Sequence, residues 1–256
     1  MPPDLRLLEA VEQIAHHAAE VVLRIYRSEF TVDTKSDATP VTLADQQAEA
    51  LILEGLASLD ASIPVVAEES VAAGRIPAID PAGRFWLVDP LDGTREFIDR
   101  NGEFTVNIAL IEDGAPRLGV VLAPALGLAY SGLVGHGAWR TEGSTRHPIR
   151  CRPIPESGLA VVASRSHGDE RALDAFLAGQ RVASRVNAGS SLKLCLLAEG
   201  RADFYPRLGR TMEWDIAAGH AVLAAAGGSV CRIDDGHALR YGKVGFENPH
   251  FVARGL

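Results

Sequence analysis

The feature that most constrains this chain is an apolar segment that ends abruptly in acidic residues. Residues 86–97 read WLVDPLDGTREF, so a strand-like run is followed by Asp89 and Asp92. Pro90 and Gly93 stand beside these carboxylates. Since Asp, Pro and Gly are common turn residues, a plain turn explains the pattern. A site for a hard cation such as Mg²⁺ also explains it, because such ions take oxygen ligands. The spacing alone leaves both interpretations open.

The residues after the second aspartate add a place for an anion. Gly93 permits a positive φ or a close backbone approach. Thr94 begins a predicted helix, whose free N–H groups and dipole attract an anion. Glu68, which closes the preceding strand, and Asp215, at a helix start, are further candidate ligands. Taken alone, these two residues are interpreted as a solvated carboxylate and a helix cap.

Composition and charge exclude several classes of protein. The chain has 256 residues, 47% of them hydrophobic and 23% charged, which suffices for one large domain or two modest ones. Its formal charge of -8, without any block of Lys or Arg, argues against a nucleic-acid partner. No apolar run approaches the roughly 20 residues that span a bilayer, and no secretory signal is visible. Three widely spaced cysteines argue against a disulfide framework or a zinc ribbon and predict a cytoplasmic protein.

Hydrophobic periodicity predicts a different organisation in each half of the chain. Apolar residues at spacings of three and four predict two long helices early in the chain, over residues 5–26 and 42–59. Short β-like runs joined by turns follow and predict an antiparallel sheet, with strands over residues 63–67, 85–88, 104–111, 117–123 and 127–134.

The second half begins after a stretch with three prolines and little periodicity, residues 143–157. Strand and helix patterns then alternate, at residues 159–164, 169–177, 190–199, 203–205 and 214–226. This alternation predicts an α/β second half. We therefore predict an N-terminal α+β region over residues 1–145 with the main metal-binding carboxylates. A C-terminal α/β region over residues 146–256 would carry Asp215 and the residues that determine substrate specificity.

Three motifs resemble the signatures of the inositol monophosphatase superfamily. They are AEES at residues 67–70, DPLDGT at 89–94 and WDIAAG at 214–219, in the family's order and in both halves of the chain. Further stretches resemble one branch, the bacterial 3'(2'),5'-bisphosphate nucleotidases of the CysQ type. They are residues 94–98, 101–107, 164–167, 189–193 and 205–207.

The resemblance implies a layered αβαβα sandwich and magnesium-dependent hydrolysis of a phosphate ester. The ligands of two or three Mg²⁺ ions would be Glu68, Asp89, Asp92, Asp215 and the backbone carbonyl of Leu91. Glu68 and the Thr94 hydroxyl would position a metal-activated water and accept its proton, and Asp45 would help to orient that water. The N–H groups of Gly93 and Thr94 would hold the scissile phosphate.

Substrate specificity would come from the second half of the chain. Inositol-specific relatives carry a glutamate shortly before the Trp-Asp signature, whereas this chain has Arg207 there, and an arginine grips a second phosphate with two N–H bonds. The resemblance implies that the substrate is bound by Gly93, Thr94, His167, Ser190, Lys193, Arg207 and Asp215. Taken alone, Lys193 and Arg207 are interpreted as exposed charges, and His167 as a capping or surface residue.

The resemblance favours removal of the 3'-phosphate of adenosine 3',5'-bisphosphate, which yields AMP and phosphate and clears a by-product of sulfate assimilation. One alternative is a broad-specificity phosphatase for inositol phosphates or fructose 1,6-bisphosphate. Another is a non-catalytic protein that binds a phosphorylated metabolite. The resemblance also implies inhibition by lithium. Homodimers and peripheral association with the inner membrane occur among such relatives, and the sequence decides neither.

Overall fold

Apolar segments joined by short turns build the larger sheet of the protein. The computed structural model describes residues 3–28, 32–34, 40–164 and 170–256. The large sheet has seven strands, which lie in the order in which they follow one another in the chain. They are β3 (Val65–Ala67), β4 (Arg84–Asp92), β5 (Thr105–Glu112), β6 (Ala115–Ala123), β7 (Leu128–Leu133), β8 (Gly137–Glu142) and β9 (Thr145–Ile149). All neighbours are antiparallel except β3 and β4, which run parallel.

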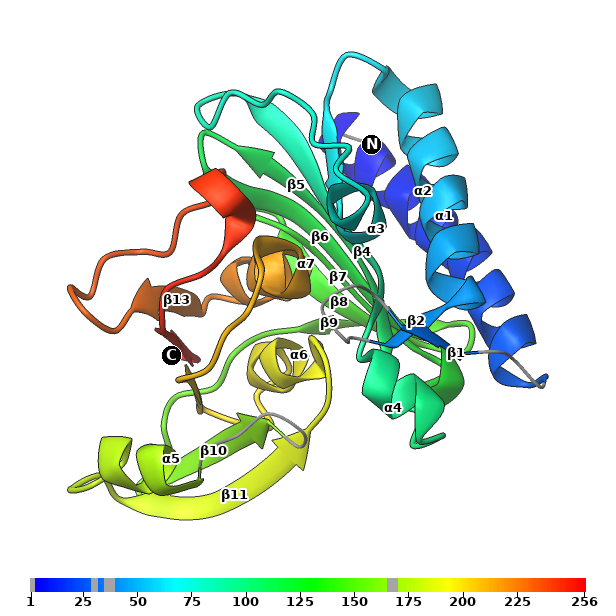
Figure 1. Cartoon of the computed structure of the whole chain (residues 1–256). Coiled ribbons are helices and arrows are strands. Elements are labelled where there is room, and N and C mark those ends of the chain that lie inside the picture. The colour runs from blue at the N-terminus through cyan, green and yellow to red at the C-terminus, as the bar shows by residue number, and fades with distance from the viewer. Residues whose placement is uncertain (1–2, 29–31, 35–39, 165–169) are drawn as a thin grey trace.

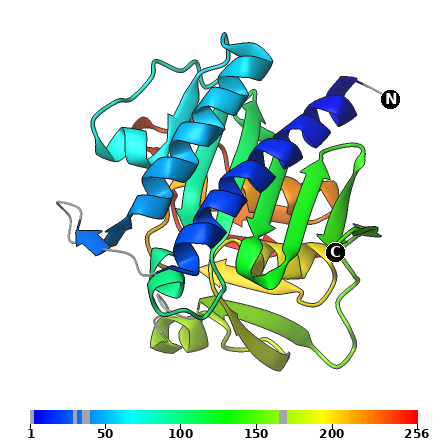
Figure 2. The ribbon, with the colours of Figure 1, turned by 90° about the vertical axis from the view of Figure 1, so that its right-hand side faces the viewer.

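Two long helices cover one face of this sheet. They are α1 (Pro3–Tyr26) and α2 (Leu43–Asp60), which confirm the two predicted helices and pack on each other and on the strands (Figures 1 and 2). Successive side chains of β4 point to opposite faces of the sheet. Trp86 belongs to the core beneath α1 and α2, whereas Leu87 belongs to the core on the other side. The strand is therefore buried on both faces.

Helix α7 (Glu213–Ala225) lies on the opposite face, directly against β5, β6 and β7. Gly119 permits this close approach, since a Cβ at that position would lie 2.3 Å from the carbonyl oxygen of Ala218. Gly132 acts likewise on the next strand, where a Cβ would lie 2.6 Å from the Cα of Val222. The helix that carries Asp215 is thereby held close to the sheet that carries the two loop aspartates.

A second sheet of five strands lies beyond α7 and its neighbour α6 (Leu192–Ala198), and α6 contacts both α7 and this sheet. In spatial order its strands are β11 (Val182–Ala188), β10 (Leu159–Ser164), β12 (Phe204–Arg207), β14 (Phe251–Arg254) and β13 (Ser229–Arg232). Helix α5 (Glu170–Phe176) packs on the outer face of this sheet (Figure 1). The layers confirm the predicted α/β class and the αβαβα sandwich.

Smaller elements complete the described chain. They are the ribbon of β1 (Val32–Thr34) and β2 (Pro40–Thr42), the short helices α3 (Glu68–Ala72) and α4 (Thr94–Ile98), and the 3-10 turns η1 (Pro124–Leu126) and η2 (Val244–Phe246). Within the described residues, no helix is long and apolar enough to cross a membrane.

The sequence patterns miss seven of the strands, namely β1, β2, β8, β9, β11, β13 and β14. Strand β9 lies inside the proline-containing stretch 143–157. Residues 183–187 of β11 are all exposed, so this strand lacks the alternation of apolar and polar residues that marks a half-buried strand.

Candidate active site

Strand pairing brings the first two candidate carboxylates together. Strands β3 and β4 are parallel, and Ala67 pairs with Val88. Glu68 and Asp89 each follow one of these paired residues, so they lie at the same end of the sheet. Both line a cavity of about 480 Å³. Their proximity depends on this parallel pairing, which sequence spacing does not reveal.

The loop after β4 turns the second aspartate into the same cavity. Asp89 Oδ1 accepts a hydrogen bond of 3.0 Å from the Leu91 N–H, and the register of β4 on β5 shifts between Asp89 and Asp92. Gly93 then adopts a left-handed conformation with φ of 87°, as the sequence predicts, and Thr94 begins α4. The Thr94 hydroxyl donates to the Leu91 carbonyl at 3.4 Å. Five of the six residues of the loop 89–94 therefore line the cavity, and Pro90 is the exception.

The start of α7 supplies the fourth carboxylate. Asp215 lines the cavity, and its Oδ2 also accepts a hydrogen bond of 2.8 Å from the Met212 N–H. Asp215 is thus a helix-capping residue and a cavity residue at once, so the two interpretations of this position are compatible.

The carboxylates of the cavity act strongly on one another. Burial raises the pKa of Asp89 well above its ordinary value, and the charges of Glu68, Asp92 and Asp215 raise it further. Burial also raises the pKa of Asp215 to about 8, followed by the effects of Asp92 and Glu68. Burial raises the pKa of Asp92, against the opposing effect of Lys193.

Such a set of oxygen donors, with Asp89 buried and the other three half-buried, fits a hard divalent cation. A cation removes the mutual repulsion of the carboxylates. Within the described residues, no three His, Cys, Asp or Glu side chains form a complete set of metal ligands. The mutual effects of these carboxylates on their pKa values still favour a cation site, because they show that the negative charges lie close together.

Asp45 occupies a different place from the other candidates. It is buried in the first turn of α2, with 1% of its surface exposed, and does not line the cavity. It lies close enough to raise the pKa of Asp89. Asp45 is thus a buried neighbour of Asp89 and not a lining residue of the cavity.

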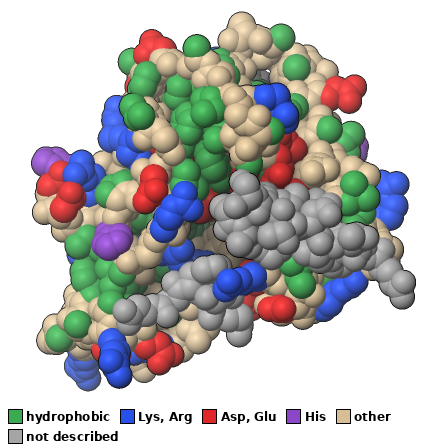
Figure 3. Space-filling view, in the orientation of Figure 1, with side chains coloured by type: hydrophobic (Ala, Val, Ile, Leu, Met, Phe, Trp, Pro, Cys, Tyr) green, Lys and Arg blue, Asp and Glu red, His purple; other side chains and the backbone are tan. Residues whose placement is uncertain are grey.

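Basic side chains line the same cavity as the carboxylates. Sequence reasoning named Lys193 and Arg207, and the structure adds Arg95 and Arg210. Figure 3 shows acidic and basic side chains close together near the centre of the face seen in Figure 1. Arg95 lies in the branch-specific stretch 94–98, but sequence reasoning assigned no role to Arg95 or Arg210. His167 lies outside the described residues.

The two predicted basic residues are already engaged with the protein. Lys193 is buried and donates to the carbonyls of Ala188 and Ser190, and its ammonium lies 5.7 Å from the ring centre of Tyr205. Burial lowers the pKa of Lys193 to about 8, against the opposing effect of Asp92. Arg207 Nη2 donates to the Arg210 carbonyl at 2.7 Å. Neither residue is the ordinary exposed charge that its position alone suggests.

Ser190, a predicted substrate contact, lies against the loop after β4. Its hydroxyl donates to the Asp92 carbonyl at 2.6 Å. A Cβ on Gly93 would lie 2.8 Å from this Oγ. The close approach of Ser190 and the left-handed φ both favour glycine at position 93.

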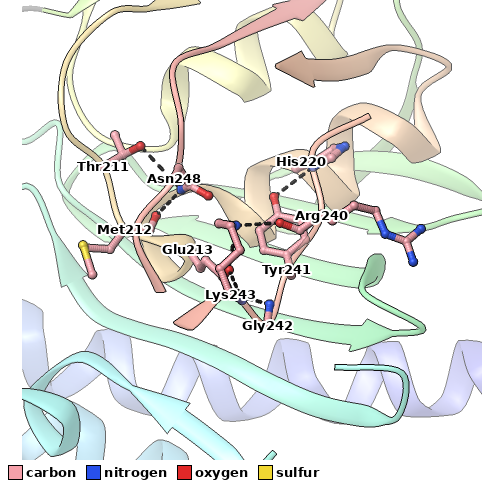
Figure 4. A network of polar contacts seen from close by, with 9 residues as sticks. All are labelled: Thr211, Met212, Glu213, His220, Arg240, Tyr241, Gly242, Lys243 and Asn248. Atoms are coloured by element: carbon pink, nitrogen blue, oxygen red, sulfur yellow. Dashed lines mark hydrogen bonds and ion pairs between the residues drawn. The ribbon is translucent and has the colours of Figure 1, made fainter. Parts of the chain in front are cut away.

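A polar network that sequence reasoning missed anchors the start of α7 (Figure 4). Glu213 is fully buried and accepts hydrogen bonds from the N–H groups of Gly242 and Lys243, at 2.8 and 2.9 Å. Its carboxylate also pairs with Lys243 Nζ at 2.6 Å. The sequence gives one indication of this role, because Glu213 is an acidic residue directly before the Trp-Asp motif.

Two further contacts of this network lie at the start and in the middle of α7 (Figure 4). Asn248 Nδ2 donates to the Met212 carbonyl at 2.7 Å. His220 Nδ1 and the Tyr241 hydroxyl are 2.8 Å apart. Burial lowers the pKa of His220 to about 3, so its ring is neutral at ordinary pH. The segment from residue 240 to 248 thus fixes α7 at several points.

Known proteins share both the sequence and the fold of this chain. The profile of the inositol monophosphatase family matches residues 5–253. A protein named 3'(2'),5'-bisphosphate nucleotidase CysQ from Escherichia coli (strain K12) is 45% identical over 234 residues, covering 88% of this chain and 89% of the relative. A protein of the same name from Buchnera aphidicola is 40% identical over 258 residues, covering 98% and 94%.

Solved structures agree with this assignment. CysQ from Bacteroides thetaiotaomicron, described as a bacterial member of the inositol monophosphatase family, has a TM-score of 0.83 and 35% identity, covering 98% of this chain and 97% of that one. An inositol monophosphatase from Anabaena (Nostoc) sp. PCC 7120 has a TM-score of 0.76 and 25% identity, covering 99% and 92%. This chain therefore belongs to the inositol monophosphatase family.

Proposed function

We propose that this chain is a magnesium-dependent phosphatase that converts adenosine 3',5'-bisphosphate to AMP and phosphate. The observation that carries the proposal is one cavity lined by five carboxylates and four basic side chains. The carboxylates are Glu68, Asp89, Asp92, Glu96 and Asp215, and the basic side chains are Arg95, Lys193, Arg207 and Arg210. Relatives of 40 to 45% identity bear the name 3'(2'),5'-bisphosphate nucleotidase. The carboxylates would bind the cation that holds the reacting phosphate, and the basic side chains would bind a second phosphate.

The residues that would hold Mg²⁺, in two or three ions, are Glu68, Asp89, Asp92, Asp215 and the carbonyl of Leu91. When bound, magnesium would neutralise the charge of the phosphate and lower the pKa of a water molecule. Within the protein, Glu68 accepts a proton from the attacking water, and the Thr94 hydroxyl and Asp45 help to orient that water. The N–H groups of Gly93 and Thr94 hold the scissile phosphate.

Comparison of phosphate release from three substrates tests the proposal. We expect kcat/KM for adenosine 3',5'-bisphosphate to exceed that for inositol 1-phosphate and fructose 1,6-bisphosphate by about a hundredfold, equivalent to roughly 2.7 kcal/mol. Similar rates would instead support a broad-specificity phosphatase. Binding of magnesium without release of phosphate from any of the three would support a non-catalytic binding protein.

Replacing Arg207 by alanine should raise KM for the bisphosphate about tenfold to a hundredfold, because a charged hydrogen-bond partner of the second phosphate is lost. KM for inositol 1-phosphate, which has one phosphate, should change much less. Steady-state kinetics on both substrates measures the difference.

Arg201→Ala provides the control for Arg207→Ala, since Arg201 is 68% exposed and lies outside the cavity. Its KM values should equal those of the unaltered protein. Equal losses on both substrates in Arg207→Ala would remove this arginine from the second-phosphate site.

The proposed metal dependence carries an expectation about lithium. We expect LiCl to reduce phosphate release at a fixed magnesium concentration, by displacing one of the proposed ions. NaCl at the same ionic strength serves as the control. Equal effects of the two salts would argue against the proposed arrangement of ions, though not against hydrolysis.

The proposed role is removal of a by-product of sulfate assimilation in the cytoplasm.

A further inference from the structure

The turn between β11 and α6 makes hydrogen bonds to other segments at three consecutive residues, two of which bond to residues of the candidate active site. The Gly189 N–H donates to Glu103 Oε2 at 2.7 Å, and the Ser190 hydroxyl donates to the Asp92 carbonyl at 2.6 Å. The Ser191 hydroxyl donates to the Asp215 carbonyl, also at 2.6 Å. One turn of the chain thus bonds both to the loop after β4 and to the first turn of α7.

The Ser191 hydroxyl does not have the role that its position suggests. Ser191 is the N-cap residue of α6, where a serine side chain usually accepts a hydrogen bond from its own helix. It makes no such cap here, and its hydroxyl bonds to the other helix instead. The residue is 3% exposed, so the bond to Asp215 is shielded from water.

Ser191 also contacts the other aspartate. Its backbone N–H faces the Asp92 carboxylate and lowers the pKa of that group, against the larger effect of burial. A single residue therefore connects Asp92 and Asp215 through two different groups. These aspartates repel each other in the cavity, so a connection of this kind opposes their separation.

The conformation of the turn supports a specific geometric role. Ser190 has a φ of 51°, a left-handed value that is uncommon for residues other than glycine. Gly189 leaves no room for a side chain, since a Cβ there would lie 2.9 Å from the Glu103 carbonyl oxygen. The chain thus adopts an unfavourable backbone conformation in a crowded place, and the result is that both serine hydroxyls reach their partners.

We propose that Ser191 is a positioning residue that sets the distance between Asp92 and Asp215. The inference rests on the proposed function, in which these two aspartates bind magnesium. The hydroxyl of Ser191 fixes the first turn of α7, and its N–H orients the Asp92 carboxylate. Neither group contacts the reacting atoms, so Ser191 acts through the two aspartates.

Ser191→Ala tests this role, because it removes the hydroxyl and keeps the N–H. We expect affinity for Mg²⁺, measured by calorimetry without substrate, to fall about tenfold, the effect of losing one buried hydrogen bond. At saturating Mg²⁺, kcat should fall while KM for the bisphosphate stays within about twofold, because Ser191 makes no proposed contact with substrate. Ser191→Cys, whose thiol is a weak donor, should lie between alanine and serine.

Ser131→Ala is the matched control, since Ser131 is also 3% exposed and lies in β7 away from the cavity. Its Mg²⁺ affinity and kcat should equal those of the unaltered protein. An unchanged Mg²⁺ affinity in Ser191→Ala, or an equal loss in Ser131→Ala, would overturn the positioning role and leave the proposed function intact. Absence of Mg²⁺ binding by the unaltered protein would overturn both.

Discussion

Replacing Glu68 by glutamine should lower kcat for the bisphosphate about a thousandfold, or about 4 kcal/mol in the barrier. The amide keeps the shape of the side chain and an oxygen that faces the cavity, but it does not accept a proton from water. The loss should therefore fall on turnover, while KM changes by less than about tenfold. Phosphate release at saturating substrate and Mg²⁺ measures the change.

Glu69→Gln is the control for Glu68→Gln, because it alters the neighbouring carboxylate, which does not line the cavity. We expect its kcat to remain within about threefold of the unaltered value, since substitutions away from the reacting groups have small effects. Equal losses in the two variants would reject Glu68 as the proton acceptor. An increase in KM without a fall in kcat in Glu68→Gln would indicate that this residue contributes to substrate binding and not to proton transfer.

The parts of the candidate site that are local in sequence were open to prediction. The loop 89–94 contains two carboxylates, a glycine that needs a left-handed φ and a helix start, all within six residues. Its conformation follows from short-range chemistry. The meeting of Glu68 with Asp89 required the parallel pairing of β3 with β4, and the addition of Asp215 required α7 to pack on the sheet. The family resemblance supplied what spacing did not.

The residues that hold the site together were not predictable in the same way. Ser191 and Glu213 act through carbonyl and N–H groups that are 24 and 29 or more positions distant in sequence. Their partners are backbone groups, which leave no pattern in the sequence. A serine or glutamate that binds a distant backbone group looks the same, in sequence, as one on the surface.

The difference between local patterns and distant contacts also explains which helices and strands the sequence predicts. Helices α1 and α2 bury one stripe each, so their periodicity is plain. Strand β11 is mostly exposed, and β14 has only four residues, three of them buried. A strand at either extreme lacks the alternation that sequence analysis detects, and its place depends on pairing with β10 or β12.

Replacing Glu213 by alanine should destabilise the protein by about 3 kcal/mol, at the lower end of the cost of breaking a buried ion pair. The lower end applies because the side chain of Lys243 is 29% exposed and regains water when its partner is removed. The N–H groups of Gly242 and Lys243 lose their acceptor and stay in the protein. For a chain of this size we expect Tm to fall by about 6–12 °C.

The control for Glu213 lies on the segment 240–248, to which the Glu213 carboxylate bonds. Glu247 pairs with Arg210 at 3.2 Å, but both side chains are more than half exposed. Exposed ion pairs contribute about 0–1 kcal/mol, so Glu247→Ala should leave Tm almost unchanged. Thermal unfolding of the two variants without metal compares them directly. If Glu213→Ala lowered Tm no more than Glu247→Ala, the buried carboxylate would not stabilise this segment.

The position of Glu213 links this loss of stability to the candidate site. Glu213 is the first residue of α7, and Asp215 lies two residues later, in the same turn. A helix start that loses its bonds to Gly242 and Lys243 loosens locally before the whole chain unfolds. Hydrogen exchange at the amides of residues 242 and 243 should therefore quicken in Glu213→Ala at temperatures well below Tm. Since Asp215 lies on the loosened turn, Mg²⁺ affinity should fall with it, whereas Glu247→Ala should alter neither.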